Sequence, residues 1–228
     1  MPKTVLIIGA SRGLGLEFAR QYSADGWTVI GTVRTRDAGQ ALKALPGADA
    51  FAMDIRREED FAEFARELQG RGVRPDLLIH NAGVNIRSEE SFAKTSFEAW
   101  NETFAVNVTG AVGSARYLAP LLPEKAGAVA VFISSELGSI AQANGGYLPY
   151  RASKAALNML VKCLAVEQAA RGVCCAALHP GWVRTDMGGA EAPLEAPDSI
   201  KAMRKAIAAL KMERTGSFLD LNGKTLPY

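Results

Sequence analysis

Near its start, this chain of 228 residues reads Thr4-Val5-Leu6-Ile7-Ile8-Gly9-Ala10-Ser11-Arg12-Gly13-Leu14-Gly15. A short apolar run passes into glycines spaced G-x-x-x-G-x-G, which predicts a buried strand, a tight turn and a helix. Glycine permits positive φ and lets a ligand approach the backbone closely. The following helix N-terminus presents free amides to a pyrophosphate. The stretch therefore predicts a dinucleotide site, and a tight turn without a ligand is the alternative. Its candidate cofactor-binding residues are Gly9, Ser11, Arg12, Gly13, Leu14 and Gly15.

Beyond this stretch, apolar runs continue to alternate with amphipathic ones. The expected strands are Thr4–Ile8, Thr28–Val33, Ala50–Met53, Leu77–His80, Ala128–Ile133 and Val173–His179, with a last one in the tail Gly216–Tyr228. The expected helices are Gly13–Ala24, Asp37–Leu45, Glu58–Arg71, Ser96–Leu118, Tyr150–Arg171 and Ile200–Lys211. Strands that are apolar nearly throughout are typical of parallel sheets covered on both faces. The alternation predicts one α/β domain over residues 1–228, a doubly wound parallel sheet flanked by helices. A segment rich in Gly, Ala, Pro and Glu at about 188–199 is interpreted as a flap over the site, or else as a solvated connector.

Composition excludes several classes of protein. Lys and Arg number 26 and Asp and Glu number 24, a net charge of +2, which argues against nucleic-acid or acidic-membrane partners. Hydrophobic residues make up 48% of the chain, yet no stretch reaches the roughly 18 apolar residues of a membrane span. The apolar run at the N-terminus is too short for a signal peptide. Three cysteines, Cys163, Cys174 and Cys175, do not form a disulfide pattern. We therefore expect a soluble protein of the cytoplasm, a reducing compartment.

The residues after the second strand bear on which dinucleotide binds. An NAD site usually carries an acid about 20 residues beyond the glycines, but Arg34 occupies that region here. Arg12 can reach the same place from the glycine turn, and two guanidiniums suit a 2′-phosphate. Asp37 is the competing candidate, three residues late. The pattern favours NADP(H) over NAD(H).

Tyr150 and Lys154 lie four residues apart on a predicted helix, so both side chains can face one cleft. A free phenol has a pKa of about 10 and is a poor acid–base catalyst at pH 7. A nearby ammonium favours the phenolate and lowers that pKa. A tunable phenol beside a dinucleotide indicates hydride transfer.

Five ordered motifs make the chain resemble the short-chain dehydrogenase/reductase family over nearly its whole length. They are Gly9–Gly15, Asn81-Ala82-Gly83, Asn107, Ser135 with Tyr150 and Lys154, and Pro180-Gly181. The resemblance implies a Rossmann-type fold. It implies that Tyr150 is the general acid/base and that Lys154 lowers its pKa and holds the nicotinamide ribose, so that both Tyr150 and Lys154 are also candidate cofactor-binding residues. It further implies that Ser135 polarises the substrate carbonyl and that Asn107 fixes a water in a proton relay.

The same resemblance suggests where the cofactor lies. Asp54 and the Ile55 amide would contact the adenine, although Asp54 could instead cap the next helix. Asn81, Ala82 and Gly83 would line the adenosine ribose. The nicotinamide would contact Pro180, Gly181, Val183 and Thr185. Trp182 would be a wall of the substrate pocket or part of the core.

Three positions leave alternatives open. The family spacing of about 13 residues before the tyrosine falls on Leu137, whereas the Ser-Ser…Gly pattern selects Ser135, with Ser134 and Ser139 as alternatives. His80 stands where many relatives have asparagine, and we interpret it as structural. His179 is interpreted in the same way. No spacing of His, Cys, Asp and Glu suggests a metal site.

The tail and the stretch around Tyr150 are similar to the C-factor-like and carbonyl-reductase-like branch. That branch implies NADPH-dependent reduction of a small carbonyl compound or oxidation of an alcohol. An NADP-binding regulatory protein and a dehydratase are the alternatives. Apolar residues extend beyond one face of the helix Tyr150–Arg171, which predicts a homodimer or, alternatively, a tetramer.

Overall fold

The sheet of the protein has seven parallel strands in the order β3-β2-β1-β4-β5-β6-β7. A computed structural model describes residues 2–86, 91–124 and 127–228. The strands are β1 (Thr4–Ile8), β2 (Thr28–Val33), β3 (Ala48–Ala52), β4 (Leu77–His80), β5 (Ala128–Ile133), β6 (Val173–Leu178) and β7 (Ser217–Leu219). The predicted doubly wound parallel sheet is confirmed. The third strand begins two residues before its predicted start, because this edge strand is only partly buried and its pattern is less apolar.

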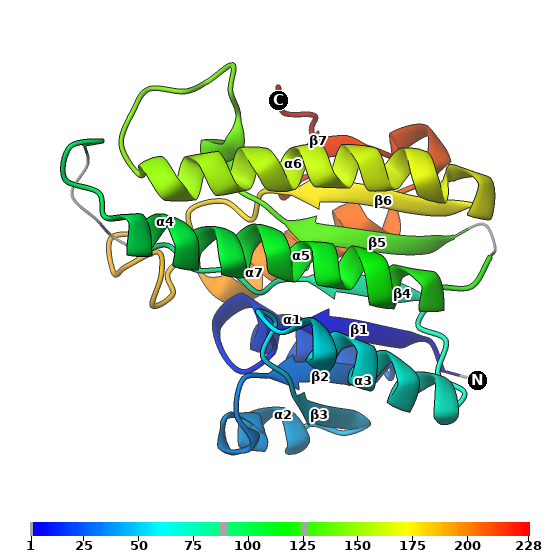
Figure 1. Cartoon of the computed structure of the whole chain (residues 1–228). Helices are drawn as coiled ribbons and strands as arrows, with labels where there is room; N and C mark the ends of the chain where they lie inside the picture. Colours follow the sequence, from blue (N-terminus) through cyan, green and yellow to red (C-terminus); the bar gives the residue numbers. More distant parts are fainter. Residues whose placement is uncertain (1, 87–90, 125–126) are drawn as a thin grey trace.

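Helices cover both faces of the sheet (Figure 1). They are α1 (Gly13–Ala24), α2 (Gln40–Lys43), α3 (Glu58–Gly70), α4 (Phe97–Phe104), α5 (Gly110–Gly113), α6 (Leu148–Gln168) and α7 (Ala196–Ala208). One core packs α3, α5 and α6 on the sheet, and the other packs α1, α2 and α7 on the opposite face. Alternate residues of each strand enter the two cores, so both faces of the parallel sheet exclude water.

Some predicted helices have different bounds. The helix predicted at Asp37–Leu45 is a 3-10 turn, Arg36–Gly39, followed by the single turn α2. The helix predicted at Tyr150–Arg171 begins earlier, at Leu148, after Tyr147 with a left-handed φ of 51°. The helix α7 begins at Ala196, inside the segment predicted as a flap, so the end of that segment is helical.

The helix predicted at Ser96–Leu118 contains two π-helical segments, Ala105–Thr109 and Ser114–Leu118, on either side of α5. Two glycines let α5 approach its neighbours. A methyl group at Gly113 would lie 2.3 Å from the Phe61 ring, and one at Gly110 would lie 2.8 Å from Ile55. This close packing fixes the position of the π-helical segment that carries Asn107.

The carboxyl ends of the strands meet at one edge of the sheet. The chain winds in opposite directions from the neighbouring strands β1 and β4, so their following loops separate and leave a crevice. Residues that follow β1, β2, β3, β4, β5 and β6 all line a single cleft there. The sheet order therefore gathers the sequence motifs into one place.

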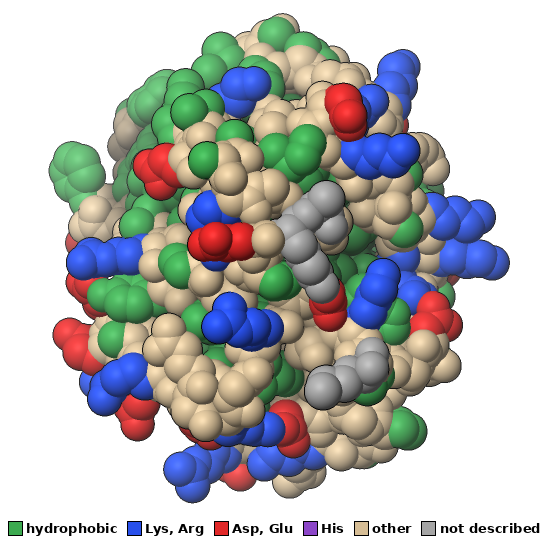
Figure 2. Space-filling view, turned by 90° about the vertical axis from the view of Figure 1, so that its right-hand side faces the viewer, with side chains coloured by type: hydrophobic (Ala, Val, Ile, Leu, Met, Phe, Trp, Pro, Cys, Tyr) green, Lys and Arg blue, Asp and Glu red, His purple; other side chains and the backbone are tan. Residues whose placement is uncertain are grey.

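The view in Figure 2 shows a face on which positive and negative side chains are interspersed, without a large area of one sign. Hydrophobic side chains gather toward the top of this view, the side on which Figure 1 places α6. Within the described parts of the chain, no helix has the length and apolar character needed to cross a bilayer.

Candidate active site

A cleft of about 550 Å³ lies at the carboxyl edge of the sheet. Predicted site residues that line it are Gly9, Ser11, Arg12, Gly13, Leu14, Arg34, Asp54, Ile55, Asn81, Ala82, Gly83, Tyr150, Lys154, Pro180 and Thr185. Predicted site residues outside this lining are Gly15, Asn107, Ser135, Gly181 and Val183. Most of the motif residues recognised in the sequence thus line one cleft.

The glycine turn closely fits its neighbours. Gly9 has a φ of 84°, and a methyl group there would lie 2.9 Å from Ala82. A methyl group at Gly15 would lie 2.0 Å from the Gly9 carbonyl oxygen, which also accepts a hydrogen bond of 2.8 Å from Asn81 Nδ2. Among the described residues no side chain caps the start of α1, whose first residues, Gly13 and Leu14, line the cleft. This cradle fits the pyrophosphate of a dinucleotide.

Tyr150, Ser135 and Lys154 lie together at the wall formed by the start of α6 and the end of β5. The Ser135 hydroxyl lies close enough to the Tyr150 phenol to lower the pKa of that phenol. Lys154 Nζ lies 5.6 Å from the centre of the Tyr150 ring and donates to the Ile133 carbonyl oxygen at 2.8 Å. The predicted shared face of Tyr150 and Lys154 is present.

Burial sets the protonation of this group. It raises the pKa of Tyr150 to about 12, although the hydrogen bond from Ser135 acts in the opposite direction. Burial also lowers the pKa of Lys154 to about 8. The net shift of the Tyr150 pKa is opposite to that expected from the ammonium alone, because loss of water around the phenol outweighs the other influences. At neutral pH, the phenol carries its proton.

Asn107 is completely buried in the π-helical segment Ala105–Thr109. Its Oδ1 accepts from the Val84 amide at 2.8 Å, and its Nδ2 donates to the Val84 carbonyl and to Ser153 Oγ. The side-chain amide is therefore fully engaged, and it ties the loop after β4 to α6 close to Lys154. Its role in a water relay stays a prediction.

The hydrogen bonds of the neighbouring serines separate their functions. Ser134 Oγ donates to Asn158 Oδ1 at 2.7 Å, which fits the structural role predicted for it. Ser135 contacts the phenol, and its Oγ also accepts from the Leu137 amide. Ser139 is buried at 1% exposure, and its hydroxyl has no partner within the described residues. This arrangement favours Ser135 as the substrate-contacting serine.

Two arginines predicted to select the cofactor lie in different surroundings. Arg34 and Asp37 are both exposed, but only Arg34 lines the cleft. Arg12 forms an ion pair of 2.6 Å with Asp186. The sequence analysis did not single out Asp186. Since these partners are 174 residues apart, no sequence spacing could have revealed the pair.

Arg56 is a second cleft residue that the sequence analysis missed. Its guanidinium contacts both oxygens of Asp54, and its Nη1 lies 3.2 Å from Glu102 of α4. The hydrogen bond from Arg56 lowers the pKa of Asp54. Asp54 is therefore already paired where an adenine amino group was predicted to bind. The position of Arg56, two residues after Asp54, was the signal in the sequence that could have indicated this ion pair.

The remaining polar residues near the cleft have structural contacts. His179 is buried, and its Nε2 lies 3.7 Å from Glu136. Trp182 is 54% exposed and donates to the Gly188 carbonyl oxygen, so it is not a core residue. No group of three or more His, Cys, Asp or Glu side chains suited to a metal occurs in the described portions of the chain.

His80 is buried at 1% exposure, stacks on Phe132 and shares a hydrogen bond of 2.8 Å with Ser114 through Nδ1. Burial, together with the charge of Lys154, lowers its pKa to about 3. Between pH 6.5 and 3 the unfolded chain therefore binds a proton that the folded chain does not, and stability falls as the pH falls.

We expect this effect to disappear in His80→Asn, since asparagine can still bond Ser114 but does not titrate. At pH 5, 1.5 units below the unfolded pKa of about 6.5, histidine should account for about 2 kcal/mol of lost stability. Urea unfolding at pH 7.5 and pH 5 measures the difference. Equal pH dependence in both proteins would contradict the assignment.

Comparison with known proteins places these features in a family. The sequence model for short chain dehydrogenases matches residues 3–195. C-signal of Myxococcus xanthus is 37% identical over 154 residues, covering 67% of this chain and 92% of that protein.

Two solved structures are similar over the whole chain. Carbonyl reductase Sniffer of D. melanogaster superposes with a TM-score of 0.91 at 28% identity and full coverage of both chains. The NADPH-bound carbonyl reductase from chicken fatty liver has a TM-score of 0.91 at 29% identity, covering 100% of this chain and 94% of that one.

Proposed function

Because this chain belongs to the short-chain dehydrogenase/reductase family, in its C-factor-like and carbonyl-reductase-like branch, we propose that it is an NADP(H)-dependent oxidoreductase. Its substrate would be an aldehyde or ketone, or the corresponding alcohol. The observation that carries the proposal is that Tyr150 and Lys154 line the same cleft as the glycine turn, with Ser135 close enough to the phenol to lower its pKa.

The cofactor assignment draws on the cleft and on the relatives. The backbone around Gly9 and Gly13 would hold the pyrophosphate, and Arg12 and Arg34 would bind the 2′-phosphate with charge-assisted hydrogen bonds. The chicken carbonyl reductase with the same fold contains NADPH. Thr185 lines the same cleft, where it would contact the nicotinamide end.

When bound, the nicotinamide supplies or accepts the hydride. Tyr150 Oη, protonated at neutral pH because burial raises the pKa, would donate its proton to the carbonyl oxygen during reduction. Ser135 would donate a hydrogen bond to the same oxygen as negative charge develops there. In the oxidative direction Tyr150 must receive a proton instead, so the positive charge of Lys154 assists by favouring the phenolate.

The proposal is tested by following NADPH and NADH absorbance in parallel against aldehydes, ketones and quinones. We expect turnover with NADPH that exceeds turnover with NADH. NADPH binding without turnover of any substrate would favour the alternative, an NADP-binding regulatory protein. The name of one relative, C-signal, is the observation that favours considering this alternative.

We also propose a homodimer formed through α5 and α6. Val112, Met159 and Val166 on these helices are 45%, 64% and 74% exposed, which is more apolar surface than one buried face requires. Light scattering of the purified protein should give about twice the chain mass of 24.3 kDa. A mass equal to one chain would exclude the dimer.

We propose that the protein works in a reducing compartment such as the cytoplasm, because its cysteines form no disulfide bond. Cys163, Cys174 and Cys175 are all free in the structure. Burial raises the pKa of Cys174 to about 11 and that of Cys175 to about 12, so neither is a reactive thiolate at neutral pH.

A further inference from the structure

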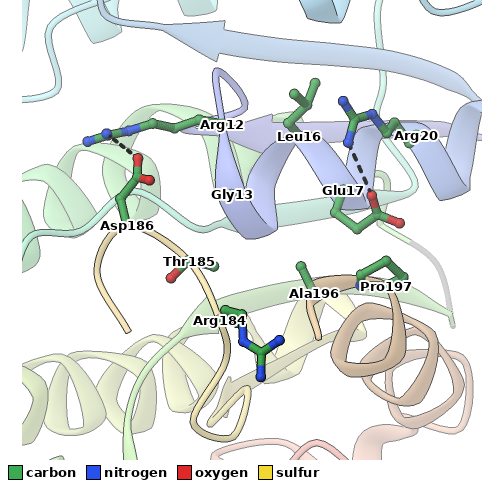
Figure 3. A pocket seen from close by; sticks show the side chains of 10 residues that line it. All are labelled: Arg12, Gly13, Leu16, Glu17, Arg20, Arg184, Thr185, Asp186, Ala196 and Pro197. Atoms are coloured by element: carbon green, nitrogen blue, oxygen red, sulfur yellow. Dashed lines mark hydrogen bonds and ion pairs between the residues drawn. The ribbon is translucent and has the colours of Figure 1, made fainter. Parts of the chain in front are cut away.

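A second cavity of about 290 Å³ adjoins the cofactor cleft and shares four of its lining residues. The shared residues are Arg12, Gly13, Thr185 and Asp186. Figure 3 shows the start of α1 on one side of this cavity and the connection from β6 to α7 on the other. The two walls approach closely, since a methyl group at Gly13 would lie 3.8 Å from the Thr185 methyl.

Each of the three arginines that line this cavity has a carboxylate partner. Arg20 pairs with Glu17 one turn away on α1, and Arg184 pairs with Glu195 within the same connection. The pair of Arg12 with Asp186 differs from these because it joins the two walls. Figure 3 shows these two side chains turned toward each other across the gap.

We propose that Asp186 is a cofactor-selectivity residue, because it holds the Arg12 guanidinium that the 2′-phosphate of NADP(H) must capture. This inference rests on the proposed function in one respect, the identity of the cofactor.

Competition follows from the geometry of the pair. Arg12 Nη1 lies 2.6 Å from Asp186 Oδ2, a full charge-assisted hydrogen bond. This contact occupies one of the five N–H donors of the guanidinium and holds the group toward the connection from β6 to α7. A 2′-phosphate attracts the same positive charge, so Asp186 competes with NADP(H) for Arg12. NADH has no 2′-phosphate and leaves the pair intact.

The exchange is energetically feasible because the pair is weak. The Arg12 and Asp186 side chains are 78% and 77% exposed, and ion pairs in water contribute little. A phosphate carries more negative charge than a carboxylate and therefore binds the Arg12 guanidinium more strongly than Asp186 does. Part of its binding energy is nevertheless used to break the existing ion pair. Asp186 thus reduces the preference for NADP(H) without abolishing it.

The experiment measures dissociation constants for NADPH and NADH by the fluorescence of the bound nicotinamide. We expect Asp186→Asn to tighten NADPH binding about two- to fivefold, the range that corresponds to loss of one exposed ion pair. The NADH constant should change no more than it does in Glu191→Gln, an exposed acid of the same connection and the matched control for net charge.

A double-mutant cycle identifies the route of the effect. In an Arg12→Met background, Asp186→Asn should no longer tighten NADPH binding, because the contested guanidinium is absent. A gain that persists there would overturn the proposal, as would a gain equal to that of Glu191→Gln. Equal weakening of both cofactors would also overturn it and would show that the pair holds the cleft closed.

Failure of the proposed function gives a different result. If the wild type binds NADPH but turns over no carbonyl compound, the oxidoreductase proposal fails. The comparison of Asp186→Asn with Glu191→Gln still tests the role of Asp186, because it measures cofactor binding alone. If the wild type binds neither cofactor, both proposals are wrong.

Discussion

Replacing Tyr150 with phenylalanine should reduce carbonyl reduction by about 10²- to 10⁴-fold, the usual contribution of one general acid. The ring remains to fill its place beside Lys154, while the hydroxyl that Ser135 contacts is lost. The carbonyl oxygen would then have to acquire its proton from water. Because the glycine turn that would hold the pyrophosphate is unchanged, NADPH should bind to the variant with a dissociation constant close to that of the wild type.

The matched control is Tyr117→Phe, which removes a hydroxyl from a surface tyrosine bonded to Glu58, away from the cleft. Steady-state rates with the best substrate, together with fluorescence titration of NADPH, separate chemistry from binding. If Tyr150→Phe retained more than a tenth of wild-type activity, Tyr150 would not be the proton donor. A fall in NADPH affinity that accounts for the entire loss would assign the residue to binding.

The second large effect should follow Gly15→Ala. The added methyl group would lie 2.0 Å from the Gly9 carbonyl oxygen and 2.6 Å from Asn81 Nδ2, and the first turn of α1 must move to relieve these contacts. Overpacking of this kind costs about 1–3 kcal/mol. If the displaced turn no longer presents its amides correctly, the dissociation constant for NADPH should rise by roughly 10- to 100-fold.

Gly70→Ala provides the control, since Gly70 ends α3 and a methyl group there would meet no atom of the described residues within 4 Å. Its stability and cofactor affinity should match or slightly exceed those of the wild type. Denaturant unfolding and NADPH titration of both variants give the two effects independently. Unchanged binding by Gly15→Ala would mean that the first turn of α1 does not hold the cofactor.

Most of the fold could be predicted because the information is local. Strands such as β5 and β6 are apolar at nearly every position and end at polar or turn residues. The start of α1 at Gly13 was predicted to the residue, since the glycine spacing marks it. The short edge elements were less accurate. The region of α2 and β3 has a weaker apolar pattern, because an edge strand and a single-turn helix bury less of their surface.

The candidate site divides in the same way. The spacing of Tyr150 and Lys154 placed both on one face of α6, and the structure shows them beside each other. The spacing did not reveal that burial would raise the pKa of the phenol, because that depends on everything packed around it. Nor did it reveal that Asp54 is paired with Arg56, which reaches across to Glu102 of α4.

The sequence by itself therefore determined the parallel α/β class, the glycine turn, and the tyrosine and lysine of the candidate site. Each of these depends on residue type and on spacings within one turn, one helix or one strand. Only the tertiary structure decided that Arg12 pairs with Asp186 and that Asn107 ties Val84 to Ser153. Such contacts join residues far apart in the chain, and it is the order of strands in the sheet and the packing of helices against it that bring them together.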